Sequence, residues 1–306
     1  MSLHVIVGAG TIGSAAARLL AESGESVRVV SRRGSGPEHA LIERVAADAT
    51  DAGRLADLTG GAAALYNCAN PRYHRWPVDW PPIAAALLSA AERSGAVLVT
   101  TSNLYGYGPV DGAMTEDLPL RPTTVKGGVR ARMWHDALAA HEAGRVRATE
   151  VRASDYVGAN AKSVFTDIVA PSVLRGRAAL VPATVDLPHS WTYTVDTART
   201  LVAVGTDPRA WGRAWHAPTN PPVSIRDLAG RLASIAGVPA PRLRRMPGAV
   251  LWLGGLFSPE AKAFREMRYQ FDAPFVLDST LTEKTFGLAP TPLDVPLREL
   301  AAESVS

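Results

Sequence analysis

Short apolar runs alternate with amphipathic stretches through the first half of the chain. The runs, rich in Val, Ile, Leu and Ala, lie at 4–7, 27–30, 45–48, 62–67, 97–101 and 149–152. Between them, apolar residues recur at helical spacing, most clearly at 14–23, 80–94 and 124–141. Parallel strands need long crossovers, which are usually helical, so this alternation predicts a parallel sheet with helices on both faces. The expected fold class is α/β, a doubly wound parallel sheet of the Rossmann type.

The pattern loosens beyond residue 154, where prolines stand at 171, 182, 188, 218, 221 and 222. We expect residues 1–154 to form the dinucleotide-binding domain. Residues 191–219 are expected to return to it, with 196–204 and 214–216 as the returning segments. Residues 155–306 are expected to form mainly a smaller C-terminal substrate-binding domain. Within it, Ser224 as N-cap and Gly237 as a stop predict a helix over 224–236.

Composition narrows the class of protein. A net charge of +3 without any basic run argues against nucleic-acid binding. The single cysteine excludes an intramolecular disulfide and fits a reducing cytoplasm, the expected location. The chain begins on a predicted strand, which argues against a secretory signal. The apolar stretch 249–257 is about half the length needed to span a bilayer, so no membrane association is expected.

A glycine-rich turn follows the first strand. Gly8, Gly10 and Gly13 match the spacing G-x-G-x-x-G, with Thr11 and Ile12 between the last two glycines, and the helical stretch from Ser14 follows. Small residues let the backbone turn tightly and approach a pyrophosphate, while the amides at the helix N-terminus favour anionic phosphates. Because the motif lies between a strand and a helix, it predicts a dinucleotide site.

The residues after the second strand address the choice of dinucleotide. An NAD site places Asp or Glu there to accept from the ribose 2′-hydroxyl, whereas this chain has Ser31-Arg32-Arg33. A guanidinium can hold a 2′-phosphate through charge-assisted hydrogen bonds but accepts none. NADP is therefore the expected cofactor and NAD the less favoured one. The alternative is that both arginines are solvated surface residues.

Several other residues end strands or begin loops at the predicted ligand-binding edge. Asp48 either accepts from the adenine amino group or serves as a helix cap or turn residue. His74, in an irregular loop over 71–77, is either a proton donor or an exposed histidine. Ligands bind outside the carboxyl ends of such strands. We therefore expect four further residues to border the cofactor: Ala69, Asn70, Thr100 and Ala153.

These segments resemble the extended short-chain dehydrogenase/reductase family, the NAD-dependent epimerase/dehydratase group. The glycine loop resembles the family's cofactor loop, and residues 100–106 look like its Ser-Ser-x-x-Val-Tyr-Gly segment. Residues 115–119 are similar to Thr-Glu-Asp-x-Pro, 152–158 to Arg-x-x-x-x-Tyr-Gly, and 191–198 to His-x-x-Tyr-Val-x-Asp-x-Ala. The likeness covers nearly the whole chain but does not identify a substrate.

The resemblance implies a Tyr-x-x-x-Lys pair on the helix that begins near residue 123. In the family, Tyr exchanges a proton with the substrate oxygen, and Lys binds the nicotinamide ribose and lowers the Tyr pKa. Lys126 is the only lysine in this helix, and Pro122 stands four residues before it. No tyrosine occurs between Tyr107 and Tyr156. The usual acid/base is therefore absent by the simplest alignment.

Substitutes for that tyrosine lie nearby. The family's hydroxyl on the fifth strand corresponds to Thr101 or Ser102, which are otherwise purely structural hydroxyls. Lys126 is expected to hold the nicotinamide ribose and to polarise a substrate carbonyl, unless it is a solvated lysine at the start of the helix. Tyr105 is the expected substitute proton donor, and its alternative is a packed aromatic residue.

The expected function is that of an atypical NADP-dependent oxidoreductase or epimerase. It would act on a small carbonyl or hydroxyl compound, such as a sugar or a biosynthetic intermediate. The alternative is an NADP-binding protein without redox turnover, either a cofactor sensor or a non-redox enzyme. The resemblance also implies a homodimer, paired through the helices after strands four and five. Six aromatic residues are expected to reach the substrate cleft: Tyr73, Trp76, Tyr105, Tyr156, Trp191 and Tyr193.

Overall fold

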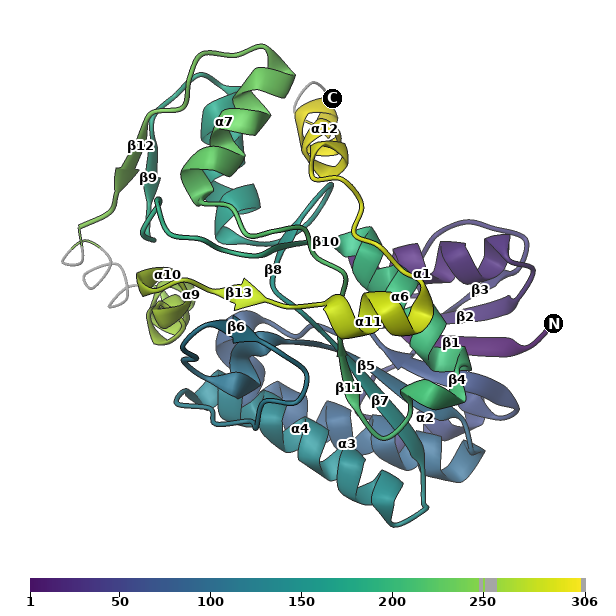
Figure 1. Cartoon of the computed structure of the whole chain (residues 1–306). Helices are drawn as coiled ribbons and strands as arrows, with labels where there is room; N and C mark the ends of the chain where they lie inside the picture. The colour runs from purple at the N-terminus through teal and green to yellow at the C-terminus, as the bar shows by residue number, and fades with distance from the viewer. Residues whose placement is uncertain (248–249, 251–257, 304–306) are drawn as a thin grey trace.

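A seven-stranded parallel sheet forms the centre of the molecule (Figure 1). The computed structural model describes residues 1–247, 250 and 258–303. The strands lie in the order β11-β7-β5-β4-β1-β2-β3, and each neighbouring pair is parallel. The predicted α/β doubly wound class is confirmed. The strand bounds are Leu3–Val7 for β1, Ser26–Ser31 for β2, Ile42–Ala46 for β3, Ala62–Asn67 for β4, Val97–Asn103 for β5, Arg147–Ala153 for β7 and Ala214–His216 for β11.

The direction in which strands are added reverses at β1. From β1 the chain first adds β2 and β3 on one side, and then adds β4, β5, β7 and β11 on the other. The helices that follow β1 and β4 are α1 (Thr11–Glu22) and α3 (Trp76–Ser94), and they pack against opposite faces. In open α/β sheets, ligands bind in the crevice at such a switch point.

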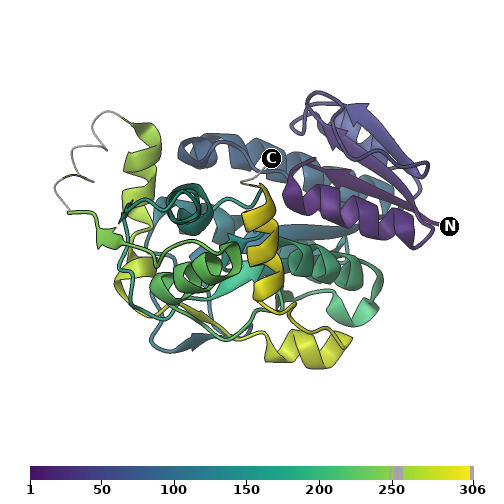
Figure 2. The same cartoon turned by 90° about the horizontal axis from the view of Figure 1, so that it is seen from above.

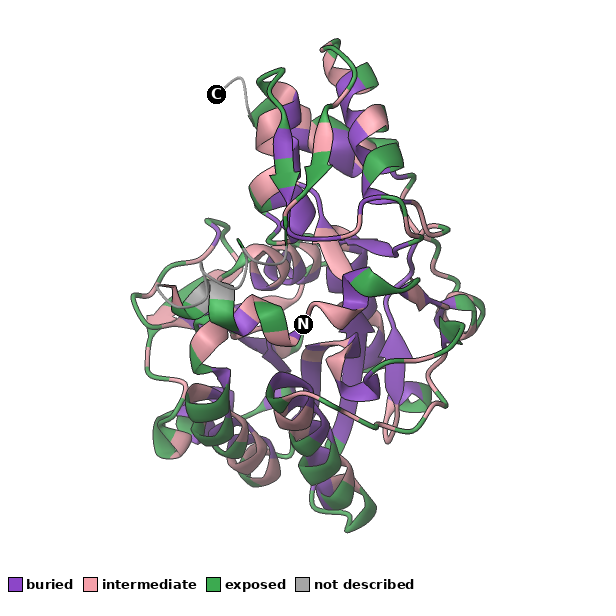
Figure 3. Ribbon diagram, turned by 90° about the vertical axis from the view of Figure 1, so that its left-hand side faces the viewer, coloured by how far each residue is buried: buried purple, intermediate pink, exposed green. Residues whose placement is uncertain are grey.

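Helices cover both faces of the sheet. One face packs against α1 and α6 (Thr194–Thr206), and the other against α2 (Ala52–Thr59), α3 and α4 (Val125–Glu142). Side chains alternate between faces along a strand, so Ile6 of β1 packs beneath α1 and α6 while Val5 and Val7 face the other helices. Figure 3 shows the strands mostly buried and the outer helix faces exposed.

The third strand differs from its predicted position. It spans Ile42–Ala46 rather than residues 45–48, so Asp48 lies beyond its end. Because β3 is an edge strand, Glu43 and Arg44 are exposed and the segment lacks the continuous apolar run of a central strand.

The helix α3 begins earlier than residue 80, where the apolar spacing starts. It begins at Trp76, and Pro77 sits in its first turn, where a missing N–H costs nothing. The loop expected over 71–77 therefore contains the short 3-10 helix η1 (Tyr73–Arg75) and the start of α3.

Residues 196–204, expected to return to the first domain, do so as a helix. They belong to α6, whose residues Ala198, Leu201 and Val204 bury one helical face against the sheet. The return to the sheet is made by β11, which pairs with β7. Helical spacing and a buried strand give similar short apolar patterns, and here the length of the segment favours a helix.

A second group of elements lies beside the carboxyl edge of the sheet and encloses its own apolar core (Figures 1 and 2). Its paired strands are β8 (Asp155–Val157) with β10 (Trp191–Tyr193), β9 (Ala179–Val181) with β12 (Leu243–Arg245), and β6 (Ala113–Met114) with β13 (Val276–Leu277). Its helices are α5 (Ala170–Leu174), α7 (Ile225–Ala236), α9 (Pro259–Glu266), α10 (Tyr269–Asp272) and α12 (Asp294–Glu303). Helix α11 (Thr280–Phe286) instead packs Leu281 and Phe286 against the core of the central sheet. Short turns complete the chain: η2 (Leu104–Tyr107), the π-helical η3 (Phe165–Val169) and η4 (Pro208–Ala210).

The predicted helix over 224–236 is confirmed as α7. The Ser224 hydroxyl accepts a hydrogen bond from the Asp227 N–H at 3.1 Å, and Asp227 completes a capping box. Gly237 ends the helix in the left-handed region at φ +66°.

Within the described part of the chain, no helix is both long and apolar enough to cross a membrane. The apolar stretch 249–257 lies outside the described residues, apart from Val250.

Candidate active site

The glycine loop between β1 and α1 is shaped by close backbone approaches. Gly8 adopts φ +112°, and a Cβ there would lie 2.3 Å from the carbonyl oxygen of Cys68. A Cβ on Gly13 would lie 2.0 Å from the carbonyl oxygen of Gly8. Gly10 is different, because it is exposed and a Cβ would meet nothing within 4 Å. The fold therefore requires glycine at positions 8 and 13, whereas Gly10 faces open space.

The N-terminus of α1 offers unpaired donors to that space. No side chain caps the helix at Gly10, and its first turn contains no acidic residue. The first amides of a helix have no intrahelical acceptor, so they and the helix dipole favour an anion. The open cradle at Gly10 and these amides fit the pyrophosphate of a dinucleotide.

Thr11 and Ile12, which open α1, are half-buried. The Thr11 hydroxyl donates to the carbonyl oxygen of Asn160 at 3.0 Å. The Asn160 N–H in turn bonds the carboxylate of Glu303 on α12, at 3.1 Å. Asn160 has φ +55°, which asparagine tolerates better than most residues. The loop that begins the helix is thereby tied to the last helix, and α12 lies between α7 and α1 in Figure 2.

The residues predicted to bind the adenosine half of the cofactor lie after β2 and β3. Arg32 and Arg33 are exposed, and the Ser31 hydroxyl accepts from the Ser35 N–H at 2.8 Å. Asp48 accepts from both the N–H and the hydroxyl of Thr50 at 2.9 Å, which is a turn role. These hydrogen bonds, and the charge of nearby Arg32, lower the pKa of Asp48.

Residues at the ends of β4 and β5 face two different sides. The Thr101 hydroxyl lies 3.4 Å from Cys68 Sγ, beside the glycine loop. Thr100 instead lines a groove between α3 and α4 on the opposite face. The other predicted border residues are a half-buried Ala69, an exposed Asn70 and a buried Ala153, and the predicted hydroxyl residue Ser102 is also buried.

Lys126, in the first turn of α4, is not the solvated lysine considered as the alternative. It is 3% exposed, and its Nζ donates to Glu266 Oε2 at 2.7 Å and to the Ala263 carbonyl at 3.2 Å. The ammonium also lies 4.8 Å from the centroid of the Tyr73 ring. Burial of an ammonium requires such partners, and here Glu266 of α9 supplies the counter-charge from 140 positions away.

Tyr105 extends from η2 into the same cluster. Its ring lies 5.9 Å from that of Trp76, and its oxygen accepts from the Tyr73 hydroxyl at 3.4 Å. Burial raises the pKa of Tyr105 to about 12. Because the hydrogen bond from Tyr73 uses a lone pair of the Tyr105 oxygen, it does not use the Tyr105 proton.

The predicted aromatic residues divide into two groups. Tyr73 and Trp76 pack edge to face at 5.1 Å beside Tyr105. The hydroxyl of Tyr156 is buried without a hydrogen-bond partner, and burial raises its pKa. Trp191 packs in the core of the second group and its indole donates to Val223, while the Tyr193 hydroxyl donates to Glu299. His74 is half-buried in η1.

Arg130 is not among the predicted site residues. It lies one helical turn after Lys126, is 7% exposed, and its guanidinium lies over the rings of Trp76 and Trp80 at 4.5 and 4.3 Å. Its Nη1 donates to the carbonyl oxygen of Thr101 at 3.3 Å. The spacing of four residues from Lys126 was the available signal, because it places both side chains on one helix face.

A family model matches most of this chain. The NAD dependent epimerase/dehydratase family matches residues 4–215, which is more than half of the chain. The chain belongs to this family. The prediction of an enzyme of the epimerase/dehydratase family is therefore confirmed. A comparison with curated proteins finds no match.

Solved structures of this epimerase/dehydratase type share the fold. A UDP-glucuronic acid 4-epimerase from Bacillus cereus, solved with UDP-glucuronic acid and NAD, has a TM-score of 0.79 at 18% identity, covering 99% of each chain. A dTDP-glucose 4,6-dehydratase from Streptomyces venezuelae, solved with NAD, has a TM-score of 0.78 at 20% identity, covering 98% of this chain and 96% of that one. Identities of this size show the fold alone.

Proposed function

We propose that this epimerase/dehydratase-family enzyme transfers hydride between a nicotinamide dinucleotide and a small carbonyl or hydroxyl compound. The observation that carries the proposal is one juxtaposition at the carboxyl edge of the sheet. The uncapped N-terminus of α1 lies beside Cys68, and Cys68 touches Thr101 at the end of β5. Lys126 and Tyr105, two groups that carry exchangeable protons, lie in the adjoining aromatic cluster.

The residues of this site have distinct tasks in the proposed reaction. When bound, the dinucleotide supplies the hydride chemistry. Tyr105 donates a proton to the substrate oxygen, since a pKa near 12 keeps the phenol protonated throughout the neutral range. Thr101 or Ser102 hydrogen-bonds the same oxygen. The Lys126 ammonium stabilises negative charge as it develops there.

The proposed substrate class is a small polyol or sugar derivative, or a comparable biosynthetic intermediate. The two neighbours named above act on a UDP-sugar and a dTDP-sugar, and this supports nucleotide sugars as the first compounds to test. Residues 155–306 would supply most of the substrate side. The test incubates purified protein with NADPH or NADH and a panel of aldehydes, ketones and nucleotide sugars. Consumption of the reduced cofactor, or epimerised product, supports the proposal.

The alternative, an NADP-binding protein without redox turnover, is favoured by one observation. Helix α4 contains no tyrosine, and its first-turn lysine is held in an ion pair. If the protein binds the dinucleotide tightly and no compound of the panel is converted, this second function replaces the first.

NADP is the proposed cofactor, and the neighbours, which were solved with NAD, lend that preference no support. Exposed Arg32 and Arg33 at the end of β2 are its basis. We expect the protein to bind NADP more tightly than NAD, and Arg32→Asp to reverse the order because a carboxylate repels the 2′-phosphate. The expected difference is about 1.5–3 kcal/mol, that of a charged hydrogen bond. Equal calorimetric affinities of the unmodified protein for both cofactors would exclude this assignment.

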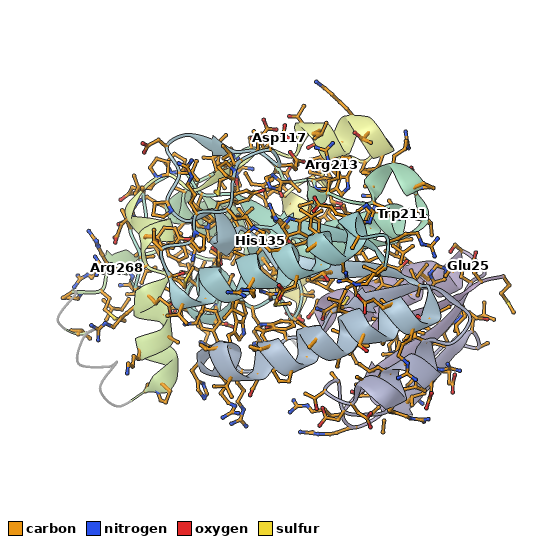
Figure 4. All side chains as sticks on the ribbon, turned by 90° about the horizontal axis from the view of Figure 1, so that it is seen from below. Glu25, Asp117, His135, Trp211, Arg213 and Arg268 are labelled. Atoms are coloured by element: carbon orange, nitrogen blue, oxygen red, sulfur yellow. The ribbon has the colours of Figure 1, made fainter. Side chains whose placement is uncertain are left out.

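A homodimer is proposed through the face formed by α3 and α4, which lie side by side in Figure 4. The groove between them has a volume of about 680 Å³, and Val125 at its rim is 61% exposed. Apolar grooves of this kind commonly mark association surfaces. The groove is lined mainly by Pro81, Ala84, Ala85, Leu88, Val125, Val129, Arg132 and Met133.

The cytoplasm remains the proposed location, on the basis of the free thiol of Cys68.

Val129→Glu is expected to convert a dimer to a monomer, because it places a charge in the apolar groove. Sedimentation velocity across a tenfold range of concentration measures the result. Val78→Glu, an exposed position of α3 outside the groove, is the matched control. A monomeric unmodified protein would contradict the proposed dimer.

A further inference from the structure

Two stretches of the chain in the second group of elements contain arginines but no acidic residue. Residues 168–185 include Arg175 and Arg177, and residues 228–247 include arginines at positions 231, 242, 244 and 245. Neither stretch contains Asp or Glu, although the chain has 29 such residues. The six positive charges exceed the net charge of +3, so the rest of the chain is net negative. Positive charge is therefore concentrated in these two stretches.

The fold brings the two stretches together in the ribbon of β9 and β12, at the outer edge of the second group in Figure 1. The Arg242 guanidinium, at the start of β12, donates to the carbonyl oxygen of Gly176 at 3.2 Å. Gly176 belongs to the turn that leads from α5 into β9, and Arg175 and Arg177 are its neighbours in sequence. The arginines of both stretches therefore lie close together at this ribbon.

One face of the ribbon is turned to solvent. Ala179, Val181 and Leu243 pack into the apolar core beneath α7. Side chains alternate along a strand, so Leu180 and Arg244, which lie beside each other in the register, occupy the other face. Arg244 is exposed, and Leu180 is 44% exposed, one of five exposed large hydrophobic side chains among the described residues. The outer face therefore combines exposed positive charge with an aliphatic side chain.

The protein supplies little counter-charge to this surface. Arg245 pairs with Asp272 at 3.2 Å, but Arg268 shares the same carboxylate at 3.1 Å. Like charges held close together repel one another, so an anionic partner would stabilise this surface. Within the described ranges of the chain, four of its arginines form no ion pair with a carboxylate: Arg175, Arg177, Arg242 and Arg244.

We propose that the outer face of the β9–β12 ribbon binds the surface of an anionic lipid bilayer. The negative potential of such a surface attracts each arginine that approaches it. Leu180, placed among the arginines, adds an apolar contact at the boundary of headgroups and acyl chains, which a nucleic acid does not offer. A surface contact needs no spanning segment, and none of the described helices is one. The sequence-based expectation of no membrane association, which considered only spans, is thereby revised.

The test measures binding of the full chain to sucrose-loaded vesicles by sedimentation. Vesicles of phosphatidylcholine alone are compared with vesicles of phosphatidylcholine and phosphatidylglycerol in equal parts. We expect binding to the anionic vesicles and none to the neutral ones. Binding should weaken as the salt concentration rises, because salt screens exposed charges. Vesicle binding requires no turnover, so the result does not depend on the proposed reaction.

Matched variants locate the surface. The double substitution Arg242→Gln and Arg244→Gln should weaken binding to anionic vesicles by about tenfold to thirtyfold. Leu180→Ser should weaken it by about fivefold, because the apolar contact is lost. The control, Arg18→Gln with Arg93→Gln, removes the same charge from exposed positions of α1 and α3 and should change binding by less than about twofold. Unchanged melting temperatures check that all three variants are folded.

Three results would overturn the proposal. They are equal binding to neutral and anionic vesicles, an equal loss in the control variant, and unchanged binding in Leu180→Ser, which would remove the preference for lipid. A short DNA duplex, followed by fluorescence anisotropy, provides the remaining comparison. If the ribbon binds the duplex and not the vesicles, and the Arg242→Gln and Arg244→Gln variant loses that binding, the surface recognises nucleic acid and the lipid assignment is rejected.

Discussion

Tyr105→Phe is expected to lower turnover by about 10²–10⁴-fold, the usual contribution of a general acid. The phenol is the donor nearest the end of β5 whose proton is not used in the hydrogen bond with Tyr73. Phenylalanine keeps the packing against Trp76, so the affinity for NADP should change little. Stopped-flow absorbance of the reduced cofactor measures turnover, and calorimetry measures affinity.

Thr101→Val and Ser102→Ala are the comparison variants for this prediction. They remove hydroxyls that would orient the substrate oxygen without protonating it, so their effects should be smaller. Turnover in Tyr105→Phe equal to that of the unmodified protein would eliminate Tyr105 as the acid. The proton would then come from Lys126 or from a water molecule beside Thr101.

Gly10→Val is expected to abolish dinucleotide binding while leaving the fold intact. A Cβ at Gly10 enters space that no protein atom occupies, in front of the amides of α1. The side chain would therefore clash only with a pyrophosphate. Loss of calorimetric binding together with an unchanged far-ultraviolet circular dichroism spectrum and melting temperature is the expected outcome.

Gly13→Val is the matched variant, in which the fold itself should fail. Its Cβ would lie 2.0 Å from the Gly8 carbonyl, and neither backbone can move without disturbing β1 or α1. We expect the free energy of unfolding to fall by about 3 kcal/mol or more. Normal NADP binding by Gly10→Val would show that the phosphates do not lie at this loop.

The parts of the fold that depend on local sequence signals could be predicted from the sequence. The glycine loop could be predicted because each glycine answers a steric or ligand requirement within a single strand-turn-helix unit. The central strands could be predicted because burial on both faces demands continuous apolar runs. The edge strand β3 could not be placed accurately, since Glu43 and Arg44 interrupt its run. The start of α3 could not be predicted accurately, because its first turn contains Pro77 and a proline is typical of a loop.

The candidate site was predicted less completely, because its decisive contacts are long-range. Nothing near Lys126 in sequence reveals that Glu266 neutralises it, so burial and solvation could not be distinguished. Arg130 resembles its neighbour Arg132 in sequence, yet one lies between two tryptophans and the other is exposed. Trp191 and Tyr193 donate hydrogen bonds to Val223 and Glu299, which are distant in sequence, so their partners could not be predicted.

The ion pair between Lys126 and Glu266 constrains how this enzyme can evolve. A neutral residue at position 126 alone would leave the carboxylate of Glu266, which is only 25% exposed, facing the aromatic cluster without a counter-charge. Loss of Glu266 alone would strand a buried ammonium. Each single substitution is therefore expected to lower the stability of the fold. Positions 126 and 266, although 140 residues apart in sequence, are therefore expected to change together rather than one at a time.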